Sequence, residues 1–184
     1  MSNKSDYLAY EPEYHAVEAV MRLHSVKRWH MIDTTRVQTL AEHSANVATL
    51  ALLIARTSPM HIFDDPMLVA AAALVHDLPE AFTGDIPTHT KRHIDGVGKL
   101  ESLVTPPVLN IQVGDASRAL IKLCDLADGI RFIRLHGVDL TARHARDGLE
   151  KQLKEKLHDL GDCWSEAVTL HVRKYIMFYA YENS

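Results

Sequence analysis

The sequence predicts an all-α fold, a bundle of about six or more helices. Two observations lead to this prediction: apolar residues recur at helical spacing along most of the 184 residues, and no strand-like alternation extends beyond a few residues. Capping residues, prolines and glycines divide the pattern into separate helices. The length is that of one ordinary domain, so we expect residues 1–184 to fold as a single domain.

The first part of the chain contains two predicted helices separated by a polar segment. Residues 12–24 carry apolar side chains at roughly helical spacing behind a first-turn proline. Residues 25–38 are mixed and polar, and we expect a connecting loop there. Thr39 and Glu42 form a capping-box pattern, which predicts a helix from residue 39 to about residue 56.

The middle of the chain begins with the most apolar predicted helix and then becomes irregular. Asp65 is an acidic N-cap followed by a proline at the first helical position. Residues 67–75 are apolar on almost every side, so we expect this helix to be central and buried. Residues 79–87 contain two prolines and a glycine and predict a loop with room for one helical turn. Residues 88–114 are the least regular part.

The last part of the chain predicts three long amphipathic helices. The first covers residues 115–137. The second is capped by Asp139 and stopped by Gly161, and the third runs from about residue 163 to residue 181. Apolar residues recur on one face of each helix, as expected for helices that pack on a common core.

Composition and charge exclude several classes of protein. The net charge is −4, whereas a duplex-binding domain usually carries a basic excess, so we expect no nucleic-acid polymer as partner. Cys124 and Cys163 do not form a CxxC pair, and residues 1–15 contain no apolar signal core. No apolar run approaches the roughly 20 residues that cross a bilayer. We therefore expect a cytoplasmic protein without a membrane partner.

Twelve histidines are present, and one His-Asp dipeptide lies in an unusual place. His76-Asp77 ends the most apolar helix, whereas the same dipeptide at His158-Asp159 lies among charged residues and is typical of a solvated surface. A largely buried imidazole and carboxylate need partners, because an unpaired buried charge is very costly. A metal ion is one such partner.

Two further side chains are candidate ligands on neighbouring helices. His43 lies in the first turn of its helix, beside the apolar stripe, and Asp128 lies between apolar residues midway along a long helix. Two imidazoles and two carboxylates suit a divalent ion that keeps open positions for water and substrate oxygen. Taken singly, His43 is better explained by a hydrogen bond to a neighbour, and Asp128 by a salt bridge to Arg131. Taken together on apolar helices, the four side chains favour a metal site.

The order His, His-Asp, Asp on an all-α chain is similar to that of the HD-domain metal-dependent phosphohydrolases. More specific matches are Glu42-His43-Ser44, the HDxxE run from His76 to Glu80, and Thr83-Gly-Asp-Ile-Pro87. These runs resemble the bacterial 5′-deoxynucleotidase (YfbR-like) branch of the superfamily and the small phage-encoded dATP triphosphohydrolases related to it. The resemblance covers about residues 15–160 and implies a single HD-type phosphohydrolase domain.

The resemblance implies a ligand set and a group of catalytic residues. One divalent metal ion, of Co, Mn, Zn or Mg, would be bound by four side chains, those of His43, His76, Asp77 and Asp128. By the same resemblance, Glu80 and Asp85 act around the attacking water and the leaving oxygen. Which of these two is the acid and which the base does not follow from the sequence.

The resemblance also implies substrate contacts. Arg28 would contact phosphate, and Trp29 would shape the sugar pocket against a ribose 2′-hydroxyl. Without the resemblance, a surface charge and a packed aromatic anchor are the simpler interpretations. After Pro87 the sequence departs from the family pattern, and Lys91 is a candidate phosphate contact by its charge alone.

The predicted function is metal-dependent hydrolysis of a small deoxynucleotide. Two substrate forms are open: a deoxynucleoside 5′-monophosphate that yields orthophosphate, or a dNTP, such as dATP, that yields triphosphate. The alternatives are a non-catalytic nucleotide-binding HD regulatory module and a helical interaction protein with a structural metal. Surplus aromatic residues on the C-terminal helix suggest a homo-oligomer, although they fit the core equally well. If the chain is phage-encoded, the compartment is the host cytoplasm.

Overall fold

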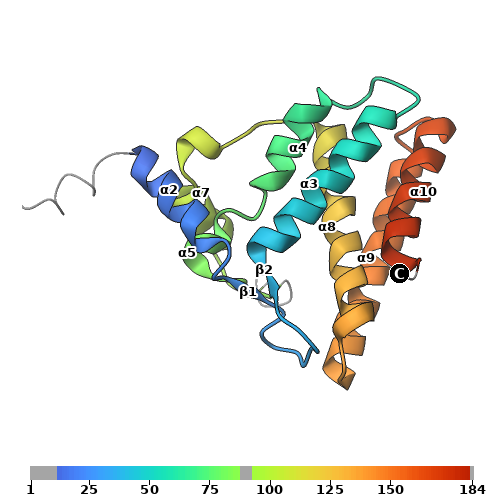
Figure 1. Cartoon of the computed structure of the whole chain (residues 1–184). Helices are drawn as coiled ribbons and strands as arrows, with labels where there is room; N and C mark the ends of the chain where they lie inside the picture. Colours follow the sequence, from blue (N-terminus) through green and yellow to red (C-terminus); the bar gives the residue numbers. More distant parts are fainter. Residues whose placement is uncertain (1–11, 88–92, 183–184) are drawn as a thin grey trace, which may run out of the picture.

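The computed structural model describes residues 12–87 and 93–182, and it confirms the all-α fold. Four long helices form a bundle on the right-hand side of Figure 1, and a shorter helix packs against the first of them. The long helices are α3 (Leu40–Thr57), α8 (Asp115–His136), α9 (Leu140–Gly161) and α10 (Glu166–Tyr181), and the shorter one is α4 (Pro66–Leu74). The main hydrophobic core lies between these helices.

A smaller group of elements lies beside the bundle, on the left of Figure 1. A second hydrophobic cluster, built on Ala19, Leu78 and Ala81, connects several of them. The elements are α2 (Pro12–Arg22), α5 (Glu80–Thr83), α7 (Val97–Val104) and the 3-10 helix η1 (Pro107–Leu109). The single turn α5 therefore sits where the two groups of helices meet, directly after His76 and Asp77.

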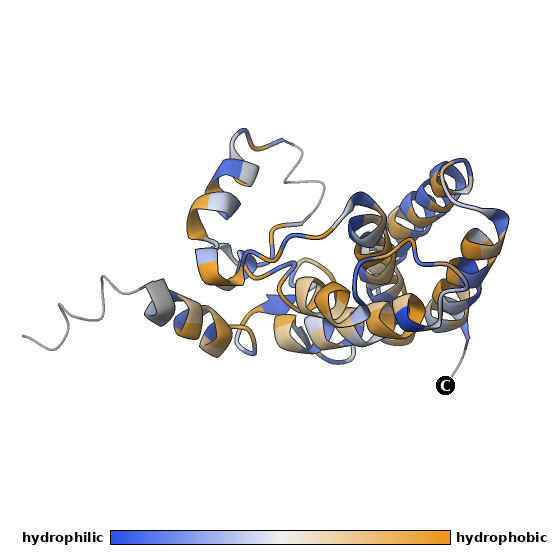
Figure 2. Cartoon of the chain, turned by 90° about the horizontal axis from the view of Figure 1, so that it is seen from above, coloured by the Kyte–Doolittle hydropathy of each residue, from blue (hydrophilic) through white to orange (hydrophobic). Residues whose placement is uncertain are grey.

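Most helix starts agree with the capping residues in the sequence. The side chain of Thr39 accepts a hydrogen bond from the backbone N–H of Glu42, and Asp65 accepts from Met67 and Leu68 at the start of α4. Asp139 caps α9 in the same way. Figure 2 shows hydrophilic and hydrophobic residues side by side on most of the helices, as expected for amphipathic helices around a core.

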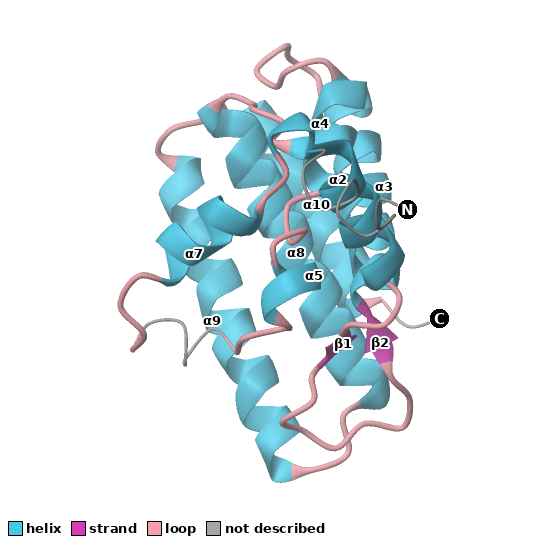
Figure 3. Cartoon of the chain, turned by 90° about the vertical axis from the view of Figure 1, so that its left-hand side faces the viewer, coloured by secondary structure: helices cyan, strands magenta, loops and turns pink. Residues whose placement is uncertain are grey.

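Two expectations about the fold were wrong. Residues 25–38 are not wholly loop, because β1 (Lys27–Arg28) pairs antiparallel with β2 (Gln38–Thr39), in the register Arg28 opposite Gln38 (Figure 3). Helix α4 is only partly buried: Met67 and Leu68 are exposed, and the neighbours cover one side alone. The described residues include no helix long and apolar enough to cross a membrane.

Glycine at position 137 is required by close packing at the end of α8. A Cβ atom there would lie 2.7 Å from the carbonyl oxygen of Ile133 and 2.8 Å from Cβ of Ala142. The same glycine forms an isolated β-bridge with Thr34, which ties the loop after β1 to the end of α8.

We predict that Gly137→Ala lowers the free energy of unfolding by about 1–3 kcal/mol, because neither the carbonyl nor Ala142 can move freely. Gly148→Ala is the matched control, since nothing lies within 4 Å of its Cβ position and it is inside α9. Alanine is the better helix former, so this control should gain about 0.5–1 kcal/mol. Urea unfolding of both variants measures these free energies. An equal change in the free energy of unfolding for the two variants would refute the packing argument.

Candidate metal centre and pocket

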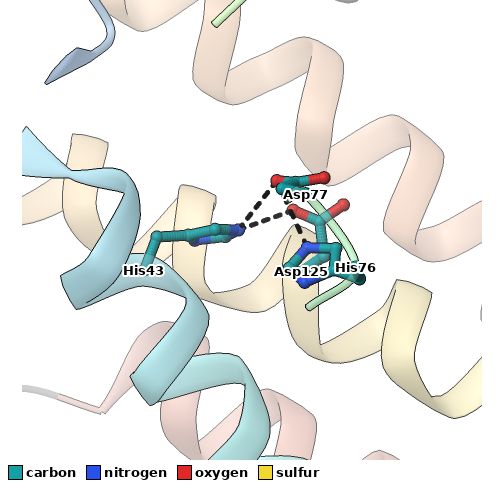
Figure 4. A group of neighbouring side chains, drawn as sticks. All are labelled: His43, His76, Asp77 and Asp125. Atoms are coloured by element: carbon teal, nitrogen blue, oxygen red, sulfur yellow. Dashed lines mark ion pairs between the residues drawn. The ribbon is translucent and has the colours of Figure 1, made fainter. Parts of the chain in front are cut away.

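Four side chains from three segments converge on one point: His43, His76, Asp77 and Asp125 (Figure 4). One ligand atom from each lies within 4.8 Å of the others. Nε2 of His43 is 3.3 Å from Oδ1 of Asp125 and 3.5 Å from Oδ2 of Asp77. Nε2 of His76 is 3.3 Å from the same Asp77 oxygen. Three of the four predicted ligands are therefore brought together.

Local structure explains why these side chains meet. His43 is in the first turn of α3, and Asp125 is midway along α8, which packs against α3. Helix α4 packs on α3 and ends at Leu74, so the turn that follows carries His76 and Asp77 to the same point. The dipeptide at the end of the apolar helix is thus directed into the molecule, whereas His158-Asp159 is exposed.

The two histidines are oriented as metal ligands. Nδ1 of His43 lies 2.7 Å from a carboxylate oxygen of Asp128, and Nδ1 of His76 lies 2.7 Å from the carbonyl oxygen of Ala73. Both partners accept hydrogen bonds, so each Nδ1 carries a proton, and Nε2 is the ring nitrogen of each histidine that faces the cluster and binds a metal ion when its own proton leaves. Both Nε2 atoms are buried and make no hydrogen bond to the described residues. The donor set therefore fits a divalent cation.

Electrostatics at this point favour positive charge. Burial and the Arg28 guanidinium lower the pKa of His43, but the surrounding carboxylates outweigh both and raise it to about 10. Burial raises the pKa of Asp77, but the neighbouring imidazoles and Arg28 hold it well below its ordinary range. The carboxylates are therefore ionised and ready to bind a cation.

Asp128 was predicted as the fourth ligand, but the structure places it elsewhere. Its carboxylate is saturated by hydrogen bonds from the protein. Oδ2 accepts from Gln38 Nε2 and His43 Nδ1, each at 2.7 Å, and Oδ1 accepts from Asn46 Nδ2 at 2.9 Å and Tyr179 Oη at 2.7 Å. A carboxylate has about four lone-pair positions, so none is left for an ion. Arg131 contacts backbone carbonyls of the C-terminal segment instead.

Asp125, which was not among the predicted ligands, takes the position expected of Asp128. The two residues are one helical turn apart on α8, so both point toward α3. Asp125 also lies between two buried residues, Cys124 and Leu126, and this signal was as strong as the one at Asp128. The choice between the two depends on which hydrogen-bond donors surround each, and that information is not local in sequence.

Arg28 lies against the cluster. Its Nη1 donates to Oδ2 of Asp77 at 2.8 Å and is 3.8 Å from Oε2 of Glu80, and its Nη2 is 3.9 Å from Oδ1 of Asp125. Strand β1 fixes this position, because Arg28 pairs with Gln38 at the start of α3. Burial lowers the pKa of Arg28, but the four surrounding carboxylates raise it overall, so it stays charged.

Trp29 is held from several sides. Its backbone has a positive φ of 62°, unusual for a residue other than glycine, and its N–H donates to Oδ2 of Asp85 at 3.1 Å. Its indole Nε1 donates to Oε1 of Gln38 at 2.8 Å. The ring stacks on Phe132, and a Cβ at Gly129 would lie only 3.2 Å from it. This strained backbone is maintained by surrounding contacts, as is common at functional sites.

The cluster opens into a pocket of about 490 Å³. Arg28, Trp29, Glu80 and Asp85 line it together with the cluster carboxylates, so these predicted site residues meet in one place. Helix α9 forms the facing wall, through Thr141, His144, Ala145, Gly148, Leu149 and Gln152. Lys122, which the sequence reasoning did not select, also lines the pocket and contacts Asp125. Lys91 lies outside the described residues.

Comparisons with known proteins point to the same family as the sequence motifs. The family model described as 5′-deoxynucleotidase YfbR-like matches residues 15–103. A dATP triphosphohydrolase of Salmonella phage PMBT28 is 32% identical over 157 residues, which cover 80% of this chain and 81% of that protein. The 5′-deoxynucleotidase PM0747 of Pasteurella multocida is 34% identical over 79 residues, covering 42% of this chain and 40% of that protein.

A solved structure is similar over most of the chain. It is described as the Cyanophage S-2L HD phosphohydrolase (DatZ) bound to dA and one catalytic Zn²⁺ ion. The TM-score is 0.73 at 27% identity, with 87% of this chain and 92% of that chain covered. The resemblance drawn from the motifs is thereby confirmed, and the chain belongs to the YfbR-like branch of the HD-domain phosphohydrolases, metal-dependent enzymes that hydrolyse deoxynucleotide phosphates.

Proposed function

We propose that this chain is a dATP triphosphohydrolase, which converts dATP and water to deoxyadenosine and triphosphate with one bound divalent metal ion. The observation that carries the proposal is the His/Asp cluster that opens into a pocket of about 490 Å³, a size suited to a small ligand. The phage relatives named dATP triphosphohydrolase match about four fifths of the chain, whereas PM0747 matches less than half of it.

The metal ion would be held by Nε2 of His43 and His76 and by the carboxylates of Asp77 and Asp125. Zinc is the first candidate, because imidazole and carboxylate ligands suit it and the similar DatZ structure contains it. When bound, such an ion lowers the pKa of its water and offsets charge on the phosphoryl oxygens. Proton transfer and substrate binding are assigned to side chains that line the pocket.

Glu80 is assigned to the attacking water. It is buried, it lines the pocket, and it lies in the turn directly after Asp77. We assign it the proton of the water as the water oxygen bonds to the α-phosphorus and the bond from that phosphorus to O5′ breaks. Over the cycle the proton returns to O5′ through Asp85 or solvent, and deoxyadenosine leaves with a neutral hydroxyl.

Asp85 and Trp29 are assigned to the sugar end of the pocket. The hydrogen bond from the Trp29 backbone fixes the Asp85 carboxylate beside the indole. This places a carboxyl group near the position we assign to O5′ and an aromatic wall near the sugar. A wall of this kind excludes an added hydroxyl by size, which is the basis we propose for preferring deoxyribose.

Two cations are available for the phosphates. Arg28 has a forked set of donors, and its Nε is buried without a hydrogen bond to the described residues. Lys122 is about half exposed and lines the same pocket. We assign both to the triphosphate and leave Lys91 as a prediction.

The other predictions about assembly and location stay open proposals. Among the aromatic residues near the C-terminus, Trp164, Tyr175 and Tyr179 pack on the main core, and Phe178 is exposed. A homo-oligomer, a cytoplasmic location and a single HD domain over residues 1–184 remain what we expect.

The substrate proposal is tested by a panel of dNMPs, dNTPs and ATP with Zn²⁺, Mn²⁺, Co²⁺ or Mg²⁺, before and after chelation. We expect metal-dependent release of triphosphate, fastest from dATP. Chromatography of the products separates the alternatives. Orthophosphate from a monophosphate alone would indicate a 5′-deoxynucleotidase, and nucleotide binding without any release would indicate a regulatory module.

The ligand assignment is tested by metal affinity and by the melting temperature with added metal. A metal that binds only the folded protein at 100 times its Kd stabilises it by about 2.7 kcal/mol. We predict that Asp125→Asn abolishes this stabilisation, whereas Asp128→Asn retains metal with an affinity about 10–100-fold lower. The control is Asp115→Asn, because Asp115 is an exposed acid on the same helix. This variant should keep the wild-type metal affinity and the wild-type stabilisation by added metal. A reversed order for the first two variants would restore Asp128 as the ligand.

The role of Glu80 is tested by Glu80→Gln. We predict that this variant binds metal normally and loses turnover by about 100-fold or more, because the amide cannot take a proton. Glu155→Gln on the exposed side of α9 is the control and should keep full activity. Loss of metal in Glu80→Gln would make Glu80 a ligand and contradict the assigned role.

A further inference from the structure

We propose that Gln38 is a positioning residue that connects Trp29 in the pocket wall to the metal centre by hydrogen bonds. The position of the Trp29 indole then affects how tightly His43 binds the metal. The inference rests on the metal centre proposed above. Trp29 Nε1 donates to Gln38 Oε1 at 2.8 Å, and Gln38 Nε2 donates to Asp128 Oδ2 at 2.7 Å. The same Asp128 oxygen accepts from His43 Nδ1 at 2.7 Å.

The chemistry of Trp29 and Asp128 determines how the Gln38 amide is oriented between them. An indole nitrogen only donates, so it requires the oxygen of the Gln38 amide. The amide nitrogen then faces Asp128. Asn46 Nδ2 and Tyr179 Oη donate to the other Asp128 oxygen, so this carboxylate acts as an acceptor toward its described partners. Gln is well suited to this position, because it must accept on one side and donate on the other.

Burial makes each link costly to break. Gln38 is 1% exposed, His43 is fully buried and Asp128 is 2% exposed. A buried polar group that loses its partner has no water to replace it, and such groups in a network reinforce each other. If the indole donor is removed, the amide is free to turn, and Asp128 loses one of the donors that orient it toward His43.

The remaining support of Asp128 provides an internal comparison. Asn46 and Tyr179 donate to its other oxygen, and neither is hydrogen-bonded to Trp29. Removal of the Asn46 side-chain amide therefore takes one hydrogen bond from Asp128 but leaves the hydrogen bonds that connect Asp128 to Trp29 through Gln38. Gln38 alone among the described partners of Asp128 makes that connection.

Trp29 also has a second route to the metal centre, which the experiment must separate. The Arg28 guanidinium lies 5.5 Å from the Trp29 ring, and Arg28 donates to the predicted ligand Asp77. A change at Trp29 that acts through Arg28 does not depend on Gln38. A double-mutant cycle distinguishes the two routes, because only the chain through Gln38 is broken in a Gln38 variant.

The experiment measures the Kd for Zn²⁺ by competition with a chelating dye, without substrate or turnover. The variants are Trp29→Phe, Gln38→Met, Asn46→Leu and the pairs of Trp29→Phe with each of the other two. Met is similar in length to Gln and removes both hydrogen bonds; Gln38→Leu replaces it if Gln38→Met does not fold by circular dichroism. We expect Gln38→Met to weaken Zn²⁺ binding about tenfold and Trp29→Phe about threefold.

The decisive comparison is the effect of Trp29→Phe in the two backgrounds. We expect it to vanish in Gln38→Met and to persist in full in Asn46→Leu. The proposal is overturned if Trp29→Phe leaves the wild-type Kd unchanged, or if it costs the same factor in Gln38→Met as in the wild type. Failure of the wild-type protein to bind any divalent ion would instead refute the metal centre itself.

Discussion

The structure depends on placing two imidazoles and two carboxylates, largely removed from water, around one point. Like charges held this close repel each other, and burial adds a desolvation cost, so the arrangement is stable only with a compensating positive charge. Arg28 supplies part of it at 2.8 Å from Asp77, and both Nε2 atoms that face the point have no hydrogen-bond partner among the described residues. The helices around this point serve to bring together side chains from three segments that are far apart in the sequence.

The fold separates the tasks of holding the ligands and shaping the pocket. Helices α3 and α8 hold His43 and Asp125 on rigid elements within the main core. The segments around β1 and α5 carry Arg28, Trp29, Glu80 and Asp85, to which we assign most of the contacts with the substrate and the attacking water. Asp128 connects the two groups of residues, because it accepts hydrogen bonds from His43 on α3, Gln38 on β2 and Tyr179 on α10. Its saturation explains both its burial and its absence from the cluster.

Much of this was predictable from the sequence. Capping residues and apolar periodicity predicted the long helices, and the position of His76-Asp77 at the end of the most apolar helix distinguished it from the exposed copy at residues 158–159. The choice between Asp125 and Asp128 was not predictable, because both face α3 one turn apart and only distant donors decide. A two-residue strand is too short to show alternation, and apolar composition does not reveal which side of α4 its neighbours leave uncovered.

The central claim is that one cation is held by His43, His76, Asp77 and Asp125. The most direct test is anomalous diffraction from crystals of the zinc-loaded protein, recorded on both sides of the zinc absorption edge. The account predicts a single strong anomalous peak per chain within bonding distance of both Nε2 atoms and of the Asp77 and Asp125 carboxylates, with Asp128 still bound to Nδ1 of His43. A peak coordinated by Asp128, or no peak between these side chains, would contradict it.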